Sequence, residues 1–263
     1  PLSTYTMYGA VTLETIKKHL RDLKAAGRLD QVKMLLLTNC TFDGLVYNPE
    51  MVMLEVLAIK PDMIFVWDEA WFGFARSSPI YRQRTAMEAA RRLEERFKDP
   101  SEAEKYGNPR VRVYATQSTH KTLTSFRQGS MIHVHDQDFG RLVHEAFEDA
   151  YMTHTSTSPN YQILASLDLG RRQVELEGYE LLEQSVSLAM TLREQIQEDE
   201  NLQKYFQVLK ARDLVPEKHR PSGLESFYSP DTGYSNMERA WQSDEFVLDP
   251  TRVTLHIGMT GMD

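Results

Sequence analysis

The segment of this sequence best suited to chemistry is Ser118-Thr119-His120-Lys121, in which a lysine directly follows a histidine. A protonated lysine is a poor nucleophile, but its amine becomes a catalytic group when a site lets it form a Schiff base with an aldehyde cofactor. The hydroxyl of Ser118 and the ring of His120 could hold a phosphate beside that amine. Asp68 could pair with a protonated ring nitrogen of the same ligand, which turns a pyridine ring into an electron sink.

Three polar segments follow apolar runs that are typical of buried strands. The segments are residues 38–44, 68–71 and 116–121, and the runs before them are 32–37, 62–67 and 111–115. A fourth run, 131–134, also reads as a strand. Three predicted helices alternate with these strands. The first is indicated by helical spacing of apolar residues over 11–23, and the third runs from Pro79 to about Phe97. The second begins at Pro49, with Met51, Leu54, Val56 and Leu57 inward. This order predicts a parallel, doubly wound α/β sheet, in which ligands bind beyond the carboxyl ends of the strands. We therefore expect the three segments to converge.

The second half of the chain has a different pattern. Residues 98–109 contain two turn signals and read as a surface excursion. Residues 171–200 are amphipathic at helical spacing, and 216–233 are rich in proline and glycine. Two short apolar runs, 246–248 and 253–255, look like strands of a second unit. We therefore expect a large domain over residues 1–170, followed over 171–263 by a linker helix and part of a smaller α+β domain.

The bulk composition excludes several classes of protein. The chain has 263 residues and a formal charge of −8, a poor profile for binding nucleic acid. No apolar run approaches the roughly 20 residues that span a bilayer, so we expect no membrane partner. A single cysteine, Cys40, allows no internal disulfide and favours a cytoplasmic location. His133 and His135 lie two residues apart, but no third metal ligand is evident, so we expect structural roles and no metal.

Four motifs, in order, resemble the fold-type-I Orn/Lys/Arg decarboxylases. Ser118-Thr119-His120-Lys121 is similar to that family's Ser-x-His-Lys signature. Residues 38–44 (TNCTFDG) resemble its Thr-Asn-x-Thr-Tyr-Asp-Gly segment, and 68–71 (DEAW) its Asp-x-Ala-Trp. Residues 154–159 (HTSTSP) are similar to part of its Met-His-x-Thr-Thr-Ser-Pro stretch. The resemblance implies a pyridoxal-5′-phosphate (PLP) transferase-like fold of the aspartate-aminotransferase type, with PLP as cofactor.

The resemblance also implies a role for each matching residue on the cofactor ring. Lys121 would carry PLP covalently, and Asp68 would pair with the pyridine nitrogen. Ala70 would touch one face of the ring, and Trp71 would lie near the ring's 3-hydroxyl. Lys121, His120 and Asp68 would then be the catalytic residues.

The cofactor's phosphate would be contacted from two subunits. Ser118 and His120 would reach it within one chain. Ser156, with Thr155, would reach the phosphate of the other subunit's cofactor, which implies a homodimer or higher oligomer with a shared site. The family's phosphate-binding Ser/Thr loop and ring-stacking histidine have no counterpart in this sequence, so we expect this chain alone to form an incomplete site.

The activity implied is decarboxylation of a basic amino acid to CO2 and a polyamine-type amine. Lysine or arginine is the preferred substrate and ornithine is possible. The proton that replaces the carboxylate would come from Lys121, His120 or water. Two alternatives stay open: another fold-type-I PLP enzyme, such as an aminotransferase or aldolase, and a catalytically silent fragment that serves assembly. Read without the resemblance, Asp68 could be a helix cap, Trp71 ordinary core, and residues 155–156 a turn before Pro159.

Overall fold

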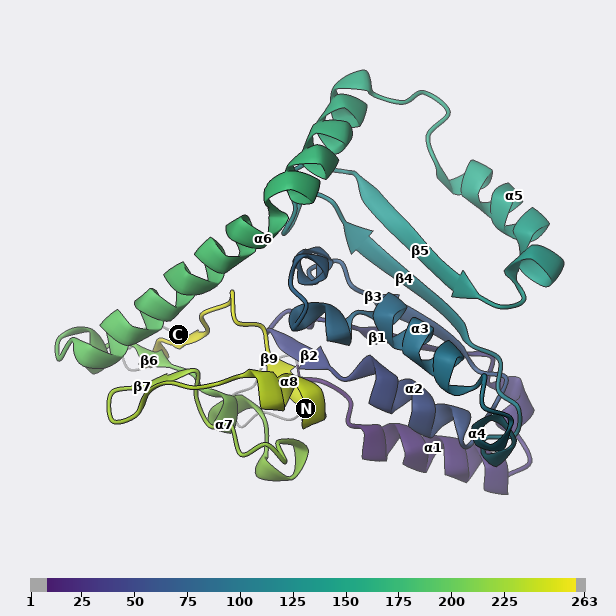
Figure 1. Cartoon of the computed structure of the whole chain (residues 1–263), viewed down its shortest axis with the longest axis horizontal. Helices are drawn as coiled ribbons and strands as arrows, with labels where there is room; N and C mark the ends of the chain where they lie inside the picture. Colours follow the sequence, from purple (N-terminus) through teal and green to yellow (C-terminus); the bar gives the residue numbers. More distant parts are fainter. Residues whose placement is uncertain (1–8, 259–263) are drawn as a thin grey trace.

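The computed structural model describes residues 9–258, and its centre is a four-stranded sheet (Figure 1). The strands lie in the order β1-β3-β4-β5, with bounds Met34–Thr38, Ile64–Asp68, Arg112–Ser118 and Ser130–Asp136. β1, β3 and β4 are parallel, as predicted, but β5 is antiparallel to β4. The expectation of an all-parallel sheet is therefore wrong for the fourth strand. The reason is that residues 119–129 contain no crossover helix, which a parallel return requires.

The two faces of the sheet differ sharply in burial. Leu37, Trp67 and Ala115 lie side by side in register on neighbouring strands, and all three are buried. Their sequence neighbours point to the opposite face. On that face Met34 is 51% exposed and Leu36 60% exposed. The buried face is therefore the one that carries the core of the domain.

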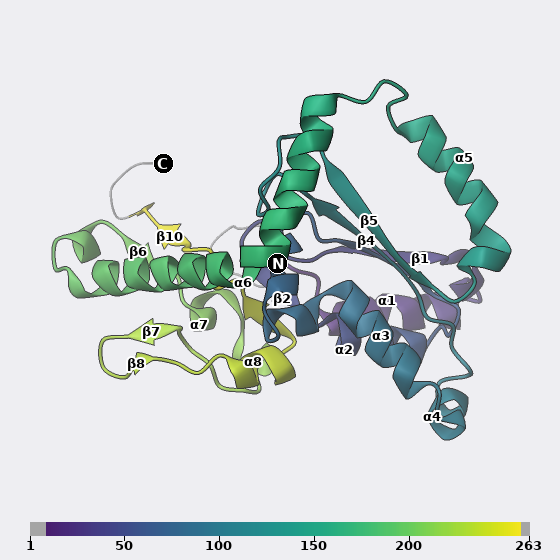
Figure 2. The ribbon, with the colours of Figure 1, turned by 45° about the horizontal axis from the view of Figure 1, so that its top comes forward.

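Three helices cover the buried face, namely α1 (Leu13–Ala25), α2 (Pro49–Leu57) and α3 (Ala86–Arg96) (Figures 1 and 2). Each begins at a residue whose side chain accepts a backbone N–H of the first turn: Thr12, Asn48 and Thr85. In α2, Val56 and Leu57 are buried as predicted, but Val52 and Met53 are buried where Met51 and Leu54 were expected. Both of the latter are half-buried.

The helix predicted from Pro79 begins later than expected. Residues 73–84 instead form two 3₁₀ turns, Gly73–Ser77 and Tyr81–Arg84, and α3 starts at Ala86. The cause is Thr85, whose hydroxyl donates to the Arg82 carbonyl and accepts the Glu88 N–H, which fixes the helix start. The surface excursion predicted over 98–109 contains a short exposed helix, α4 (Pro100–Lys105), which precedes β4. A further short strand, β2 (Leu45–Tyr47), lies between β1 and α2 in the sequence.

The longest element is α6 (Tyr161–Glu198), which begins ten residues before the predicted start because Asn160 caps it. Its second half is packed, with Leu182, Val186 and Met190 buried, whereas Tyr161 is 80% exposed. The preceding helix α5 (His144–His154) has no buried residue. It follows a π-helical turn over Phe139–Val143, and it stands apart from the sheet in Figures 1 and 2.

The C-terminal segment is built from short elements. They are β6 (Gln207–Val208), α7 (Ala211–Leu214), β7 (Tyr228–Ser229), β8 (Gly233–Tyr234), α8 (Glu238–Ser243), β9 (Phe246–Leu248) and β10 (Leu255–His256). β10 pairs with β6, but β9 pairs with β2, next to the central sheet, rather than with a strand of the second unit as expected. The segment therefore returns to the first domain, and the division at residue 170, which falls inside α6, stays a prediction. No helix among residues 9–258 is long and apolar enough to cross a membrane.

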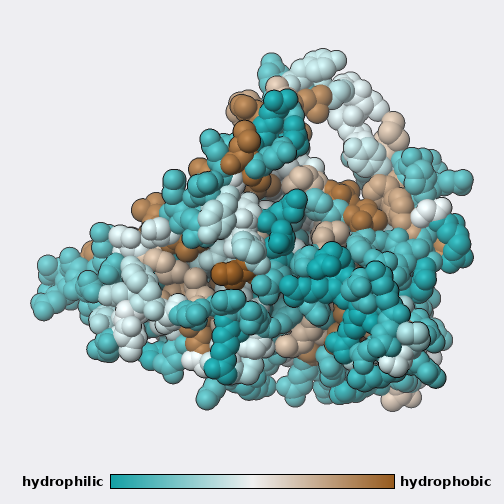
Figure 3. Space-filling model, in the orientation of Figure 1, coloured by the Kyte–Doolittle hydropathy of each residue, from teal (hydrophilic) through white to brown (hydrophobic). Residues whose placement is uncertain are grey.

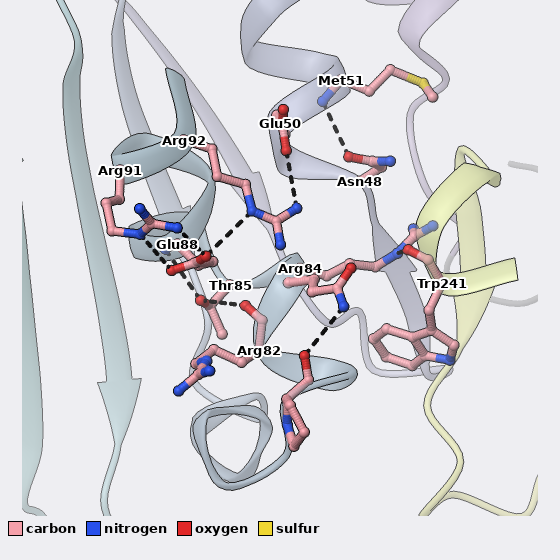
Figure 4. Close-up of polar contacts among 12 residues, drawn as sticks. Asn48, Glu50, Met51, Arg82, Arg84, Thr85, Glu88, Arg91, Arg92 and Trp241 are labelled. Carbon is pink, nitrogen blue, oxygen red and sulfur yellow. Dashed lines mark hydrogen bonds and ion pairs between the residues drawn. The ribbon is translucent and has the colours of Figure 1, made fainter. Parts of the chain in front are cut away.

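Arg84 joins the C-terminal segment to the sheet domain through hydrogen bonds, and its replacement is expected to lower the free energy of unfolding. Arg84 is 1% exposed, and its guanidinium donates to the Trp241 carbonyl at 2.8 Å (Figure 4). It also donates to the carbonyls of Ala240 (3.0 Å) and Asp244 (2.6 Å). Burial lowers its pKa to about 9, partly offset by Asp244. Arg84→Met removes the donor from the buried carbonyls of Trp241 and Asp244, whereas the Ala240 carbonyl still accepts the Asp244 N–H. We therefore expect a loss of at least ~3 kcal/mol in the free energy of unfolding.

Urea unfolding of the variant measures this loss. The control is Arg91→Met, because Arg91 is exposed and pairs with Glu88 on the surface of α3 (Figure 4). That change should cost no more than ~1 kcal/mol. Equal effects of the two substitutions would contradict the role assigned to Arg84.

Candidate active site

The carboxyl ends of β1, β3 and β4 bring three polar side chains into one row. Thr38 pairs with Asp68 across β1 and β3, and Asp68 pairs with Thr116 across β3 and β4. Asp68 is half-buried, and its Oδ1 accepts the N–H of Ala70 at 3.0 Å. This is the strand edge at which the sequence predicted convergence. The carboxylate thus lies at the exit of the middle of the three parallel strands.

Lys121 and Trp71 meet at this edge. The Lys121 Nζ lies 5.0 Å from the centroid of the Trp71 indole, a cation–π contact. Trp71 also meets Phe42 edge to face, with centroids 6.3 Å apart. Phe42 follows β1, Trp71 follows β3 and Lys121 follows β4, so all three predicted segments contribute to one cluster. Lys121 is exposed, which leaves its amine accessible to a ligand.

Ser118 and His120 flank the end of β4. Ser118 is the last residue of the strand and pairs with Ser130 of β5. The Nδ1 atom of His120 lies 3.1 Å from the carbonyl oxygen of Gly129. Because a carbonyl only accepts, Nδ1 carries the proton in this contact, and Nε2 can donate to a phosphate only when the ring is charged.

Thr155 and Ser156 do not join this cluster. They follow α5, in the connection to α6 that stands apart from the sheet (Figure 1). The Thr155 hydroxyl donates to the Tyr151 carbonyl at 2.8 Å, and the Ser156 hydroxyl accepts the Ser158 N–H at 3.1 Å. Both are exposed. Their predicted role, toward a cofactor of another subunit, stays a prediction.

Arg252 belongs to the cluster and was missed from the sequence. Its guanidinium carbon lies 4.9 Å from the centroid of the Trp71 ring. It donates to the carbonyls of Thr41, at 2.7 Å, and Phe42, and it pairs with Asp249 at 3.3 Å. Burial raises the pKa of the Asp249 carboxyl, and Arg252 is among the groups that oppose the rise. The C-terminal segment thus supplies a cation to the site, and nothing in the local sequence around Arg252 signals this.

Glu69 is a second residue that the sequence did not single out. It is 0% exposed and faces the helix side of the sheet, behind Asp68. Its carboxylate accepts the Ala86 N–H at 2.7 Å, the Gln117 amide at 3.0 Å and the Asn39 amide at 3.4 Å. Burial raises the pKa of Glu69 to about 7, those three hydrogen bonds oppose the rise, and Asp68 adds to it.

The raised pKa of Glu69 predicts a pH-dependent part of the stability. An ordinary glutamate has a pKa of 4.5, so between pH 4.5 and about 7 the folded chain keeps a proton that the unfolded chain releases. Stability from this group is therefore complete below pH 4.5 and is lost as pH rises to about 7, by up to roughly 3 kcal/mol. Glu69→Gln removes this dependence. Unfolding in urea at pH 5 and pH 8 tests it, and a wild-type-to-variant difference that is the same at both pH values would contradict it.

The two histidines on β5 make contacts with protein groups. His133 Nε2 lies 3.1 Å from the Gln117 side-chain oxygen, and His135 Nε2 lies 2.9 Å from Glu94. No group of three or more potential metal-ligating His, Cys, Asp or Glu side chains occurs within residues 9–258. His133 therefore extends the hydrogen-bond network of Glu69 and Gln117.

The fold is an α/β domain that carries a lysine and a carboxylate beyond the carboxyl ends of its parallel strands. The family model "Orn/Lys/Arg decarboxylase, major domain" matches residues 3–263, so this chain belongs to that family and the resemblance is confirmed. It is 36% identical over 170 residues to lysine decarboxylase LdcA of Pseudomonas aeruginosa, covering 64% of this chain and 20% of that protein. It is 35% identical over 158 residues to the biodegradative arginine decarboxylase of Escherichia coli, covering 60% of this chain and 19% of that protein.

The fold is also found among solved structures. Lysine decarboxylase A from Pseudomonas aeruginosa superposes with a TM-score of 0.61 and 26% identity, over 95% of this chain and 32% of that one. The predicted α/β fold is thereby confirmed. The chain spans about a fifth of the length of the two curated relatives above.

The chemistry of the clustered side chains fits PLP. An accessible primary amine suits its aldehyde, a carboxylate suits its protonated ring nitrogen, and a hydroxyl and an imidazole suit its phosphate. The indole of Trp71, held between loop and lysine contacts, offers a flat wall beside that amine. These residue types therefore fit PLP, with Lys121 as the residue that would hold its aldehyde and Asp68 as the one that would face its ring nitrogen.

Proposed function

We propose that the protein is a PLP-dependent decarboxylase of a basic amino acid, with lysine or arginine preferred and ornithine possible. The observation that carries the proposal is the contact of Lys121 Nζ with the Trp71 ring, whose centroid lies 5.0 Å away. Trp71 follows Asp68 by three residues in the sequence. Membership of the decarboxylase family supports it. So do relatives named for lysine and for arginine.

The residues at the edge of the sheet take distinct roles in this proposal. Lys121 would hold the cofactor through its Nζ. Asp68 holds a proton on the ring nitrogen, while Ala70 and Trp71 line the ring. When bound, PLP supplies the electron sink that lets CO2 leave. The Ala70 N–H fixes the carboxylate of Asp68, so this charge is oriented before any ligand binds. Charges that are preorganised in this way give the most effective electrostatic stabilisation.

The phosphate and the partner subunit complete the proposal. Ser118 and His120 contact the phosphate within the chain, and Thr155 and Ser156 contact that of the other subunit in a homodimer or higher oligomer. The exposure of α5 and of the connection after it supports this, because those side chains are free of the chain's own core. We also keep a cytoplasmic location as a prediction.

A substrate panel tests the proposed function. The holoenzyme is incubated with lysine, arginine and ornithine, and released CO2, amine and keto acid are measured. We expect CO2 and the matching amine from at least one substrate, without keto acid. Keto acid without CO2 would make the protein an aminotransferase, and no product from any of the three would favour a catalytically silent fragment.

A further inference from the structure

We infer that Glu69 is a positioning residue of the proposed site, which holds the exits of β1, β3 and β4 in one arrangement through Asn39 and Gln117. The inference rests on the proposed function. It concerns a side chain on the face of the sheet opposite Asp68, which does not touch the cofactor.

The position of Glu69 follows from the geometry of β3. Asp68 and Glu69 are consecutive, so their side chains leave the strand on opposite faces. The Glu69 N–H donates to the Thr116 carbonyl at 2.8 Å, which extends the pairing of β3 with β4 one residue beyond Asp68. On the other side, the Asn39 N–H donates to the Asp68 carbonyl at 2.8 Å. Glu69 therefore stands at the one point where all three parallel strands end.

Each hydrogen-bond partner of Glu69 adjoins an element of the site. Asn39 begins the loop whose Phe42 meets Trp71, and the Asn39 amide is itself fixed by the Tyr47 N–H at 3.0 Å and the Arg84 carbonyl at 3.0 Å. Gln117 directly precedes Ser118. Ala86 is the first residue of α3, whose amino end is thereby tied to the strand edge. One carboxylate thus links the two neighbouring strand exits and a helix.

The direction of these hydrogen bonds fixes which groups around Glu69 are donors and which are acceptors. The Gln117 oxygen faces His133 Nε2 at 3.1 Å, which places its amide nitrogen toward Glu69. All three groups around Glu69 therefore donate, which matches the ionised carboxylate present above about pH 7, because that form only accepts. In a Glu69→Gln variant the new side-chain NH2 group, if it faced Gln117, would meet the NH2 group of that residue, and two donors cannot bond. The pair would match only if the Gln117 amide were rotated or Gln117 were replaced by an acceptor. A reciprocal exchange, Glu69→Gln with Gln117→Glu, restores complementary partners along the whole chain of contacts.

The experiment measures PLP binding to the holoenzyme and its variants, by the dissociation constant and by the position of the visible absorption band. Glu69→Ala and Gln117→Glu are each expected to weaken PLP binding at least ~10-fold and to shift the band. The double variant E69Q/Q117E should return within ~3-fold of the wild type, as expected for directly coupled residues. Wild-type affinity and an unshifted band in both single variants would overturn the inference.

Two controls separate positioning from simple destabilisation. Glu88→Gln removes a carboxylate at the same end of α3 that accepts hydrogen bonds from Arg91 and Arg92, and it should leave PLP binding unchanged. Leu93→Ala weakens the buried core of α3 without touching the strand exits. If Leu93→Ala, at equal loss of thermal stability, weakens PLP binding as much as Glu69→Ala does, the inference is overturned.

The inference can still be tested if the single variants of Glu69 and Gln117 do not fold. If the single variants do not fold, the exchange variant and the milder Gln117→Ala decide: a folded exchange variant with wild-type melting temperature but weak PLP binding contradicts it. A wild-type protein that binds no PLP refutes the proposed function and the inference with it. Normal PLP binding in the wild type and in every variant refutes the inference alone.

Discussion

Replacing Lys121 by alanine is expected to lower CO2 release from the substrate by at least ~10²-fold. The variant loses the amine that holds the cofactor and one candidate for moving a proton at the reacting carbon, and general acid–base catalysis alone contributes roughly 10²–10⁴-fold. The amine is exposed and lies against Trp71, so its removal opens no cavity in the core. The fold should therefore remain intact.

The matched control is Lys105→Ala on α4, an exposed lysine that pairs with Glu102 at 3.7 Å. Its activity should equal that of the wild type. Comparable activity of the Lys121 variant and this control, at equal cofactor occupancy, would show that Lys121 does not hold the cofactor.

Asp68→Asn is expected to lower kcat by roughly 10²–10³-fold while the cofactor remains attached. Asparagine keeps the shape and can still accept the Ala70 N–H, but it loses the negative charge that stabilises a protonated ring nitrogen. The effect should therefore fall on kcat more than on KM. Steady-state kinetics with the preferred substrate measures it.

A carboxylate near the other end of the same strand provides the comparison. Asp62, which lies just before β3 and pairs with Lys60 at 2.7 Å, is exposed on its side chain by 65%. Asp62→Asn should leave kcat unchanged. A kcat for Asp68→Asn within a few-fold of this control would remove Asp68 from the catalytic residues.

The strands and their exits could be predicted because the signals are local. Apolar runs such as 62–67 end at polar residues within a few positions of where β3 ends. The direction of β5 could not be predicted in the same way, because it depends on what the connection 119–129 does in three dimensions. The start of α3 was wrong for a related reason. Pro79 is a permissive helix start, but Thr85 supplies the cap, and the intervening residues are used to pack against the C-terminal segment through Arg84.

The site divides along the same line. Lys121 and Asp68 stand in short motifs at predicted strand ends, so their types indicated a chemistry before any fold was known, whereas the role of Trp71 was implied only by the resemblance to the family. Arg252 reaches Trp71 only because β9 pairs with β2 and brings the C-terminal segment back to the sheet. Glu69 sits within a motif, but its meaning depends on partners from β1, β4 and α3. Long-range contacts of this kind leave no periodic or local trace in a single sequence.

Reduction of the holoenzyme with labelled borohydride, followed by peptide mapping, is the most direct measurement of where the cofactor is attached. The account predicts one labelled peptide, with the reduced cofactor on the side-chain nitrogen of residue 121 and the visible band lost in step with labelling. Label on a different lysine, or none on a protein that still releases CO2 from a basic amino acid, would contradict it.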